Sequence, residues 1–375
     1  MFEIQKEGEI MSNGYYGTVH PCETNLKIPT VVKRCKQSDD DLPSLIEPLI
    51  TLSMTHPNIL KCYHAYYDEI TTDLVMVQER YEKDLYSVKE INPDEALHLI
   101  TCILQGLRAL DERCIIHGDL KPENILIKGK DAVICDFGIS LIRQPVKGNL
   151  YSDDIICTEI YRAPELFDKS TVASPKVDIW SLGVMALEMC IGGCRLFHHK
   201  STVKSINDWA AYTGQSYSID LGEKEETKGT FNKRIKKVGE EWRKVYELGK
   251  WMTTYDPYSR PSAYDILTSG KLGKVSLKPY TMDYRCPIKP SVEDLESSRR
   301  MMRLKLRIDS VSGQLDFIFA CFREHYNLNK SVDFSCVLFS VISGVELNRS
   351  NISGFSISEF RTAMEKLSFF ILPPS

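Results

Sequence analysis

The residues that most constrain the fold lie between positions 116 and 138, where short apolar runs alternate with polar side chains. A polar loop holds Asp119, Lys121 and Asn124, and the apolar residues 125–127 that leave this loop predict a buried strand. A second apolar run, residues 132–134, predicts another strand and leads into Asp136, Phe137 and Gly138. The sequence therefore places two carboxylates, an ammonium group and an amide at the ends of apolar strands.

Residues 116–124 and 136–138 together resemble the catalytic segment of eukaryotic-type serine/threonine protein kinases. The resemblance implies that Asp119 accepts the proton of a substrate hydroxyl and that Lys121 neutralises the migrating phosphoryl group. Asn124 and Asp136 are then expected to hold magnesium. Lys121, two residues after the expected catalytic Asp119, is typical of the serine/threonine class.

The N-terminal residues fit the same family with one departure. Residues 12–19 predict a glycine-rich hairpin that keeps Gly14 and Gly17 for close approach to phosphates, although Ser12 stands where the first glycine is usual. Residues 30–33 predict a strand that carries Lys33, which the resemblance places on the α- and β-phosphates of ATP. Glu47 is the expected ion-pair partner of Lys33.

Further residues are expected to surround the adenine base. The resemblance implies that residues 73–81 form the strand that enters a hinge, with Gln78 at the back of the pocket. Backbone groups of Glu79 and Tyr81 are expected to bind the adenine edge. Four apolar residues would sandwich the base, and ordinary core packing would explain them nearly as well: Met11, Val19, Val31 and Leu126.

Downstream motifs are structural. Glu165 closes the expected activation segment and is predicted to form a partly buried ion pair with Arg260. Residues 178–183 predict the beginning of a buried helix. The Tyr-Arg pair at 161–162 and the Arg-Leu-Phe at 195–197 resemble the branch of cyclin-dependent and MAP kinases.

The expected fold is α+β, with the two lobes of a protein kinase: a β-rich N-lobe and a helical C-lobe. Asn92 is the predicted cap of the first long helix, with Pro93 in its first turn. The predicted domains are a kinase domain at 1–272, a proline-punctuated linker at 273–291 and an all-α C-terminal extension at 292–375. The extension faintly resembles half of a cyclin box, although a generic helical extension that braces the large lobe is the simpler interpretation.

Composition agrees with an intracellular enzyme. The net charge of −4 argues against a general nucleic-acid-binding protein, and the absence of a long apolar run predicts no membrane partner. The twelve cysteines form no Cys-X-X-Cys pair, and several, such as Cys102, Cys135 and Cys190, lie in apolar runs. They are therefore interpreted as reduced core residues and not as zinc ligands.

The predicted function is ATP- and Mg²⁺-dependent phosphorylation of protein hydroxyls, with ATP and Mg²⁺ as cofactors. A catalytically impaired pseudokinase scaffold is the alternative, although such proteins usually lose Lys33, Asp119 or Asp136. A small-molecule kinase is disfavoured by the complete activation segment that ends at Glu165.

The activation loop departs from the pattern of this branch. The expected branch reads an activation-loop phosphothreonine with three arginines, and the matching positions here carry Ile46, Gly118 and Leu141. With Asp153 near the expected acceptor position, phosphorylation of this loop is predicted not to be the switch.

The helix that carries Glu47 is expected to be weakly held. Pro48 disfavours helical geometry at the residue before it, so the helix is predicted to begin at Pro48. One turn after Glu47, where the family usually has a Leu that stacks toward Phe137, this chain has Thr51, and the neighbouring strand position carries Cys62. Both substitutions are expected to remove apolar contact. Support is therefore expected from a cyclin-like partner or from residues 292–372 of the same chain.

Overall fold

The computed structural model describes residues 4–14, 17–26, 28–35, 46–67, 71, 73–113, 115–142, 157–167, 173–197, 202–215 and 238–282. The chain forms two compact units, each described below by itself. The first comprises Met1–Thr55, Leu60–Arg80 and Tyr280–Ser375, and the second comprises His56–Ile59 and Tyr81–Pro279. The expected extension at 292–375 lies outside the described residues, and the division at 272 and 291 stays a prediction.

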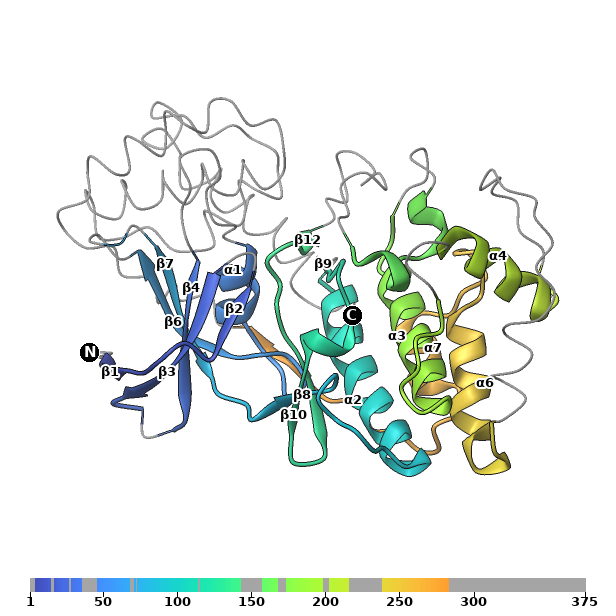
Figure 1. Ribbon diagram of the computed structural model, residues 1–375, viewed down its shortest axis with the longest axis horizontal. Helices are drawn as coiled ribbons and strands as arrows, with labels where there is room; N and C mark the ends of the chain where they lie inside the picture. Colours follow the sequence, from blue (N-terminus) through green and yellow to red (C-terminus); the bar gives the residue numbers. More distant parts are fainter. Residues whose placement is uncertain are drawn as a thin grey trace, which may run out of the picture. The chain divides into compact units, whose positions relative to one another are not determined.

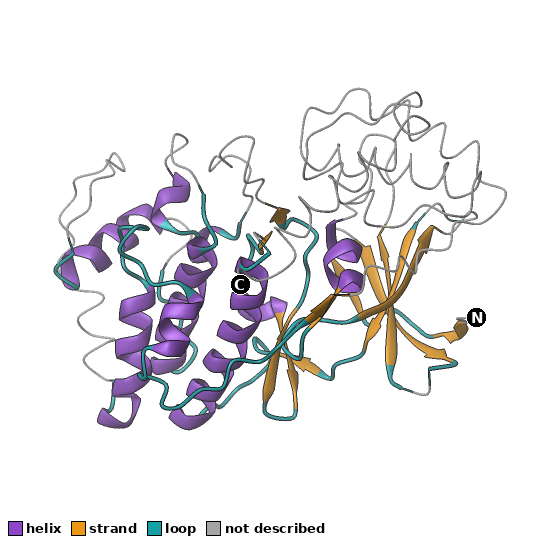
Figure 2. Ribbon diagram, turned by 180° about the vertical axis from the view of Figure 1, so that it is seen from behind, coloured by secondary structure: helices purple, strands orange, loops and turns teal. Residues whose placement is uncertain are grey.

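The first unit is built on an antiparallel sheet (Figures 1 and 2). Its strands follow the order β1-β3-β4-β7-β6, and β2 pairs with β3 outside this path. Their bounds are β1 Ile4–Glu7, β2 Ser12–Gly14, β3 Gly17–Thr24, β4 Thr30–Cys35, β6 Cys62–Tyr67 and β7 Leu74–Glu79. This arrangement confirms the expected β-rich N-terminal region.

Apolar side chains form a buried cluster on one face of this sheet. Val32, Val75 and Val77 are fully buried there, with Cys22 beside them and Ile4 packed against the group. Because side chains alternate between the two faces of a strand, Val75 and Val77 share one face of β7. In the pairing of β4 with β7, Val32 lies opposite Val77 and Lys33 opposite Met76.

Helix α1 spans Ile46–Ser53, so the prediction that it begins at Pro48 was wrong. Pro48 stands in the first turn, where backbone N–H groups have no partner within the helix, and its missing N–H therefore costs nothing. Glu47 belongs to the same first turn. Strand β5 (Met54–Thr55) follows α1 directly and pairs with β13 (Thr281–Met282), so a distant segment of the chain joins the end of this helix.

The second unit is mainly helical, which confirms the expected helix-rich region. Helices α2, α3, α6 and α7 pack side by side (Figure 1). The helix bounds are α2 Pro93–Asp111, α3 Lys176–Cys190, α4 Thr202–Tyr212, α6 Arg243–Met252 and α7 Ala263–Thr268. Asn92 caps α2 as predicted, because its side chain accepts from the backbone of Asp94 and Glu95 while Glu95 bonds back to the cap.

Helix α3 is buried along nearly its whole length, as predicted from residues 178–183. Its contact with α6 depends on two glycines. A Cβ atom at Gly183 would lie 2.8 Å from the Cβ of Met252, and a Cβ at Gly249 would lie 2.8 Å from the Cγ of Leu187. The two helices approach so closely because these positions carry no side chain.

Several segments that connect the helices of the second unit pair as short strands. The two strands predicted from residues 125–127 and 132–134 are present as β10 (Ile125–Lys128) and β11 (Asp131–Ile134), which pair as an antiparallel hairpin, and β8 (Lys83–Asp84) pairs with β10. A second small ladder joins β9 (Ile115–Ile116) to β12 (Leu141–Ile142). The described residues contain no helix that is long and apolar enough to cross a membrane.

The described cysteines are all reduced. Seven are buried and only Cys194 is exposed; Cys102, Cys135 and Cys190 are among the buried ones. The interpretation of these three as core residues is confirmed in terms of burial.

Candidate active site

In the first unit, Lys33 forms an ion pair with Glu47. The Lys33 Nζ lies 2.6 Å from Glu47 Oε2, and the side chains are only 13% and 3% exposed. Gln78 Nε2 donates to the other oxygen of the carboxylate, Oε1, at 3.1 Å. Because Gln78 lies on β7 next to β4, the sheet itself sets the distance between these two partners of Glu47.

The glycine-rich segment is a β-hairpin in which Gly14 lies opposite Gly17, and its tip lies outside the described residues. Gly17 has φ 153°, and a Cβ there would lie 1.9 Å from the backbone oxygen of Arg34. Position 17 therefore requires glycine. Ser12, which replaces the usual first glycine, pairs with Val19 in regular strand geometry.

The predicted base-binding residues of the first unit lie on or beside this sheet. Val31 is buried on β4, Val19 is half-buried on β3, and Met11, just before β2, is 46% exposed. The Met11 N–H donates to the Val19 oxygen at 2.8 Å. Glu79 ends β7 and donates its own N–H to the Lys61 oxygen at 3.2 Å.

Two further predicted base-binding residues belong to the second unit. Leu126 lies half-buried on β10, opposite Val133. The ammonium group of Lys128 lies 5.9 Å from the centre of the Tyr81 ring. Tyr81 thus contacts the hairpin that carries Leu126.

Asp178 of α3 holds the backbone of the polar loop that follows β9. Its two carboxylate oxygens accept the backbone N–H groups of His117 at 2.8 Å and Gly118 at 3.0 Å. Complete burial raises the pKa of Asp178, although His117 and these two hydrogen bonds oppose that shift. Gly118 has φ 82°, a conformation that glycine adopts without strain.

Asp119 is surrounded by donors. Its Oδ1 accepts from the backbone N–H of Thr158 at 2.9 Å and from the Thr158 hydroxyl at 2.7 Å. Its Oδ2 accepts from Lys121 Nζ at 2.5 Å, and the same ammonium group donates to the Thr158 hydroxyl at 3.2 Å. Asp119, Lys121 and Thr158 therefore form one hydrogen-bonded triangle of side chains.

Asn124 fastens the end of this loop. Its Nδ2 donates to the backbone oxygen of Asp119 at 2.8 Å, while the Asn124 backbone oxygen accepts from Cys135 N at 3.0 Å. Cys135 precedes Asp136 directly, so the hydrogen bond to Cys135 ties the polar loop to the second predicted metal ligand.

Asp136 has φ 63°, in the left-handed region, and is the only described residue other than glycine with a positive φ. Asp and Asn tolerate this conformation better than other residues with a side chain. Phe137 is completely buried, with its ring 5.1 Å from that of His117. His117 accepts from Asp119 N through Nδ1 and donates through Nε2 to the Cys135 oxygen at 2.9 Å.

These residues fit a magnesium ion by the chemistry of their donors. Asn124 and Asp136 offer amide and carboxylate oxygens, which are the ligands that Mg²⁺ prefers. Since the Asn124 nitrogen is turned toward Asp119, its oxygen is the atom left for a metal.

The predicted pair of Glu165 and Arg260 is present and bidentate, with N–O distances of 2.6 and 2.9 Å. The pair was expected to be partly buried, but both side chains are almost completely inaccessible to solvent. Arg260 also donates to the backbone oxygens of Lys176, Thr254 and Tyr255, so these carbonyls replace its lost hydration.

Sequence reasoning missed two partners in these arrangements. Thr158 lies five residues before Ala163, and only its position ahead of the Ala-Pro-Glu motif could have suggested a contact with Asp119. Gln78 was predicted to line a pocket, and no sequence signal indicated that it donates to Glu47.

Comparison with known proteins agrees with this description. Residues 5–270 match the family described as the protein kinase domain. The chain is 32% identical over 200 residues to cyclin-dependent kinase E-1 of Arabidopsis thaliana, covering 48% of this chain and 42% of that protein.

Two MAP kinases give similar matches. Mitogen-activated protein kinase mpk-1 of Caenorhabditis elegans is 29% identical over 174 residues, covering 44% of this chain and 39% of the relative. Mitogen-activated protein kinase 15 of Arabidopsis thaliana is 26% identical over 310 residues, covering 74% and 52%. The chain thus spans roughly two fifths to half of the length of these relatives.

Proposed function

The chain belongs to the protein kinase family, and we propose that it is a serine/threonine kinase that transfers the ATP γ-phosphate to protein hydroxyls. The observation that carries this proposal is the triangle of Asp119, Lys121 and Thr158. It combines a proton acceptor and a cation at one position, which is what transfer to an alcohol requires.

In this proposal, Asp119 orients the substrate hydroxyl and accepts its proton as the new P–O bond forms. Lys121 lies within hydrogen-bond distance of Asp119, so its charge stabilises the negative charge that builds up on the transferred group. Thr158 fixes the carboxylate by two hydrogen bonds, which keeps its orientation constant before the substrate arrives.

Lys33 is proposed to bind the α- and β-phosphates. Its ion pair with Glu47 orients the ammonium group, and the hydrogen bond from Gln78 to the other carboxylate oxygen of Glu47 helps to hold that carboxylate in place. The amides of the hairpin around Gly14 and Gly17 are proposed to cover the phosphates.

Asn124 and Asp136 are proposed to hold Mg²⁺. When bound, the ion supplies positive charge at the phosphate oxygens. The hydrogen bond between Cys135 and Asn124 keeps the two ligands on linked segments. Burial of Phe137 anchors the residue directly after Asp136.

For the adenine base we propose backbone contacts at Glu79 and Tyr81 and apolar contacts with Met11, Val19, Val31 and Leu126. Protein substrates are proposed because the chain carries the complete activation segment through Glu165. A cyclin-like partner, or the predicted extension at 292–375, is proposed to support α1.

The test is transfer of radiolabelled phosphate from ATP to a generic protein substrate, followed by identification of the phosphorylated amino acid. We expect phosphoserine or phosphothreonine with the full chain and none with Asp119→Asn. Nucleotide binding without transfer in the parent protein would instead support a pseudokinase scaffold. Label found only on tyrosine would contradict the proposed specificity.

A further inference from the structure

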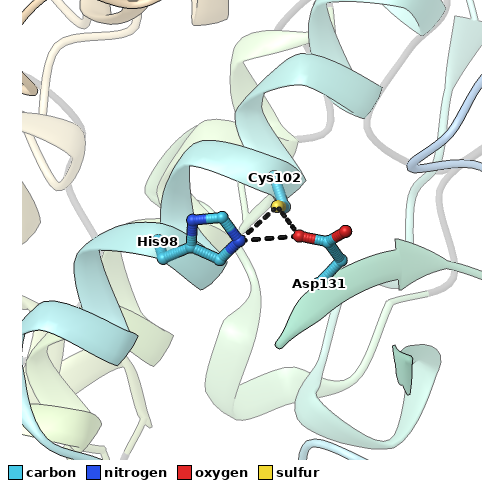
Figure 3. A group of neighbouring side chains, drawn as sticks. All are labelled: His98, Cys102 and Asp131. Atoms are coloured by element: carbon cyan, nitrogen blue, oxygen red, sulfur yellow. Dashed lines mark hydrogen bonds and ion pairs between the residues drawn. The ribbon is translucent and has the colours of Figure 1, made fainter. Parts of the chain in front are cut away.

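Three potential metal ligands meet on the second unit, apart from the residues proposed for catalysis. They are His98 and Cys102 of α2 and Asp131 at the start of β11 (Figure 3). The His98 Nε2 lies 2.7 Å from Asp131 Oδ1. The Cys102 Sγ lies 3.6 Å from His98 Nε2 and 3.7 Å from Asp131 Oδ1.

These distances suit a tetrahedral metal ion. With metal–ligand bonds of about 2.0–2.3 Å, the ligand atoms of a zinc ion stand about 3.3–3.6 Å apart. Both distances from the Cys102 sulfur already approach this value. Only the hydrogen bond of His98 to Asp131 has to lengthen, and these two side chains are 41% and 48% exposed and thus have room to move.

The packing of α2 on β11 holds the ligands in place. His98 and Cys102 are four residues apart and therefore lie on one face of the helix, and Gly106 continues that face by one more turn. A Cβ atom at Gly106 would lie 2.8 Å from Ile134 Cδ1 of β11 and 2.9 Å from the Asn58 oxygen. This close contact fixes the helix against the strand, so the three ligands are brought together by the core.

Burial and a neighbouring charge have opposite effects on the ionisation of Cys102 and Asp131. Burial raises the pKa of the Cys102 thiol, so the thiolate needs a compensating positive charge. The hydrogen bond with His98 is the main cause that lowers the pKa of Asp131. The Lys278 ammonium group acts in the same direction on the pKa of both Asp131 and Cys102, and it is itself bonded to Asn58 Oδ1 at 3.0 Å. Lys278 thus favours the ionised ligands, although it also repels a cation.

We infer that His98, Cys102 and Asp131 form a binding site for a divalent transition metal, with zinc as the ion that this donor set fits best. A thiolate and an imidazole favour zinc over magnesium or calcium, which take oxygen ligands. A solvent molecule would complete the tetrahedron on the exposed side. The inference does not depend on the proposed kinase activity.

A bound metal would join two segments that lead to the proposed catalytic residues. Helix α2 delivers the chain to β9 and Asp119, and β11 leads to Asp136. The ion would add a link between helix and strand at the end of the hairpin. Its expected effect is therefore on stability.

The test is a zinc titration of the full-length protein after removal of metals, in competition with a chromophoric chelator. We expect one zinc ion per chain with a sub-micromolar dissociation constant. Cys102→Ala, His98→Gln and Asp131→Asn should each weaken binding at least tenfold. The exposed cysteine variant Cys194→Ser is the matched control and should bind as the parent does.

Cobalt supplies a second readout, because a thiolate ligand gives a charge-transfer absorption band that Cys102→Ala must abolish. If Cys102→Ala does not fold, the His98 and Asp131 variants decide the question, since their side chains are half-exposed. A parent protein that binds no zinc at micromolar concentration, or variants that bind as tightly as the parent, would overturn the inference. The cluster would then be a surface ion pair above a buried thiol.

Discussion

Thr158 donates two hydrogen bonds to a single oxygen of Asp119, one from its backbone N–H at 2.9 Å and one from its hydroxyl at 2.7 Å. The two residues are 39 positions apart and lie on different loops of the second unit. The contact therefore makes the orientation of the proposed catalytic carboxylate depend on the segment just before Ala163.

Replacing Thr158 with Val removes the hydroxyl and keeps the side-chain shape. A hydrogen bond to a charged group contributes about 1.5–3 kcal/mol, so we expect kcat to fall roughly 10- to 100-fold. Thr158→Ser should retain most of the activity because it keeps the donor. Steady-state phosphate transfer with both variants checks this, and equal losses in the two would show that the hydroxyl is not what matters.

Asp136 offers a test that separates charge from backbone geometry. Asp136→Asn should abolish transfer while preserving stability, since Asn also tolerates the φ of 63° and lacks the negative charge that Mg²⁺ requires. Asp136→Ala should lose activity equally and should also lower the free energy of unfolding by about 1 kcal/mol. Chemical denaturation and transfer assays measure the two effects. Turnover near that of the parent in either variant would contradict the assignment of Asp136.

The strands and helices around the site could be predicted because their signals are local. The apolar runs at 125–127 and 132–134 became β10 and β11, and the cap at Asn92 became the start of α2. The start of the helix that carries Glu47 was predicted wrongly, because Pro48 was expected to exclude the residue before it from the helix. The first turn of a helix accepts proline, and α1 begins at Ile46.

Contacts between distant residues could not be predicted in the same way. Gln78 and Glu47 are 31 positions apart, and His98 and Asp131 are 33 positions apart. Their proximity follows from strand register and helix packing, which a single sequence does not display. The ion pair of Glu165 and Arg260 was an exception, because family motifs contain both residues.

Activation-loop phosphorylation is predicted not to control activity. Gly118 and Leu141 offer no cation where the branch carries arginines, and Gly118 instead donates its N–H to Asp178. The loop itself, residues 143–156, lies outside the described residues. Treatment of the active protein with a phosphatase should leave its turnover unchanged, and a strong loss of activity after treatment would refute the prediction.

The histidine at position 56 should make the protein sensitive to acid. Burial, with the nearby charges of Arg108 and Lys278, lowers the pKa of His56 to about 4 from the usual 6.5. Between these two pH values the unfolded chain binds a proton that the folded protein does not, so stability falls as the pH falls through this window. The loss can reach ~3 kcal/mol near pH 4.

Denaturation by urea at several pH values tests the role of His56. In His56→Asn, where the amide oxygen can accept the Asn58 N–H in place of Nδ1, the slope of stability between pH 4 and 6.5 should be smaller than in the parent. Above pH 7 the difference between the two proteins should no longer change with pH. An unchanged slope in the variant would assign the acid sensitivity to other groups.

The last prediction concerns the support of α1. Thr51, on α1 itself, and Cys62, on β6, are both buried, and the Thr51 hydroxyl donates to the backbone oxygen of Glu47 at 2.7 Å. Strand β13 pairs with β5 immediately after the helix, at Thr281 with Thr55 and Met282 with Met54. Loss of β13 would leave β5, the strand that directly follows α1, without this partner.

Three chain lengths separate the possible sources of support: residues 1–280, residues 1–284 and the full chain. If β13 fixes α1, residues 1–284 should be more active and more stable than residues 1–280. If the segment 292–372 supplies the support, only the full chain should be active without an added partner. Equal activity of all three, measured with no partner present, would show that α1 needs neither segment to hold Glu47 against Lys33.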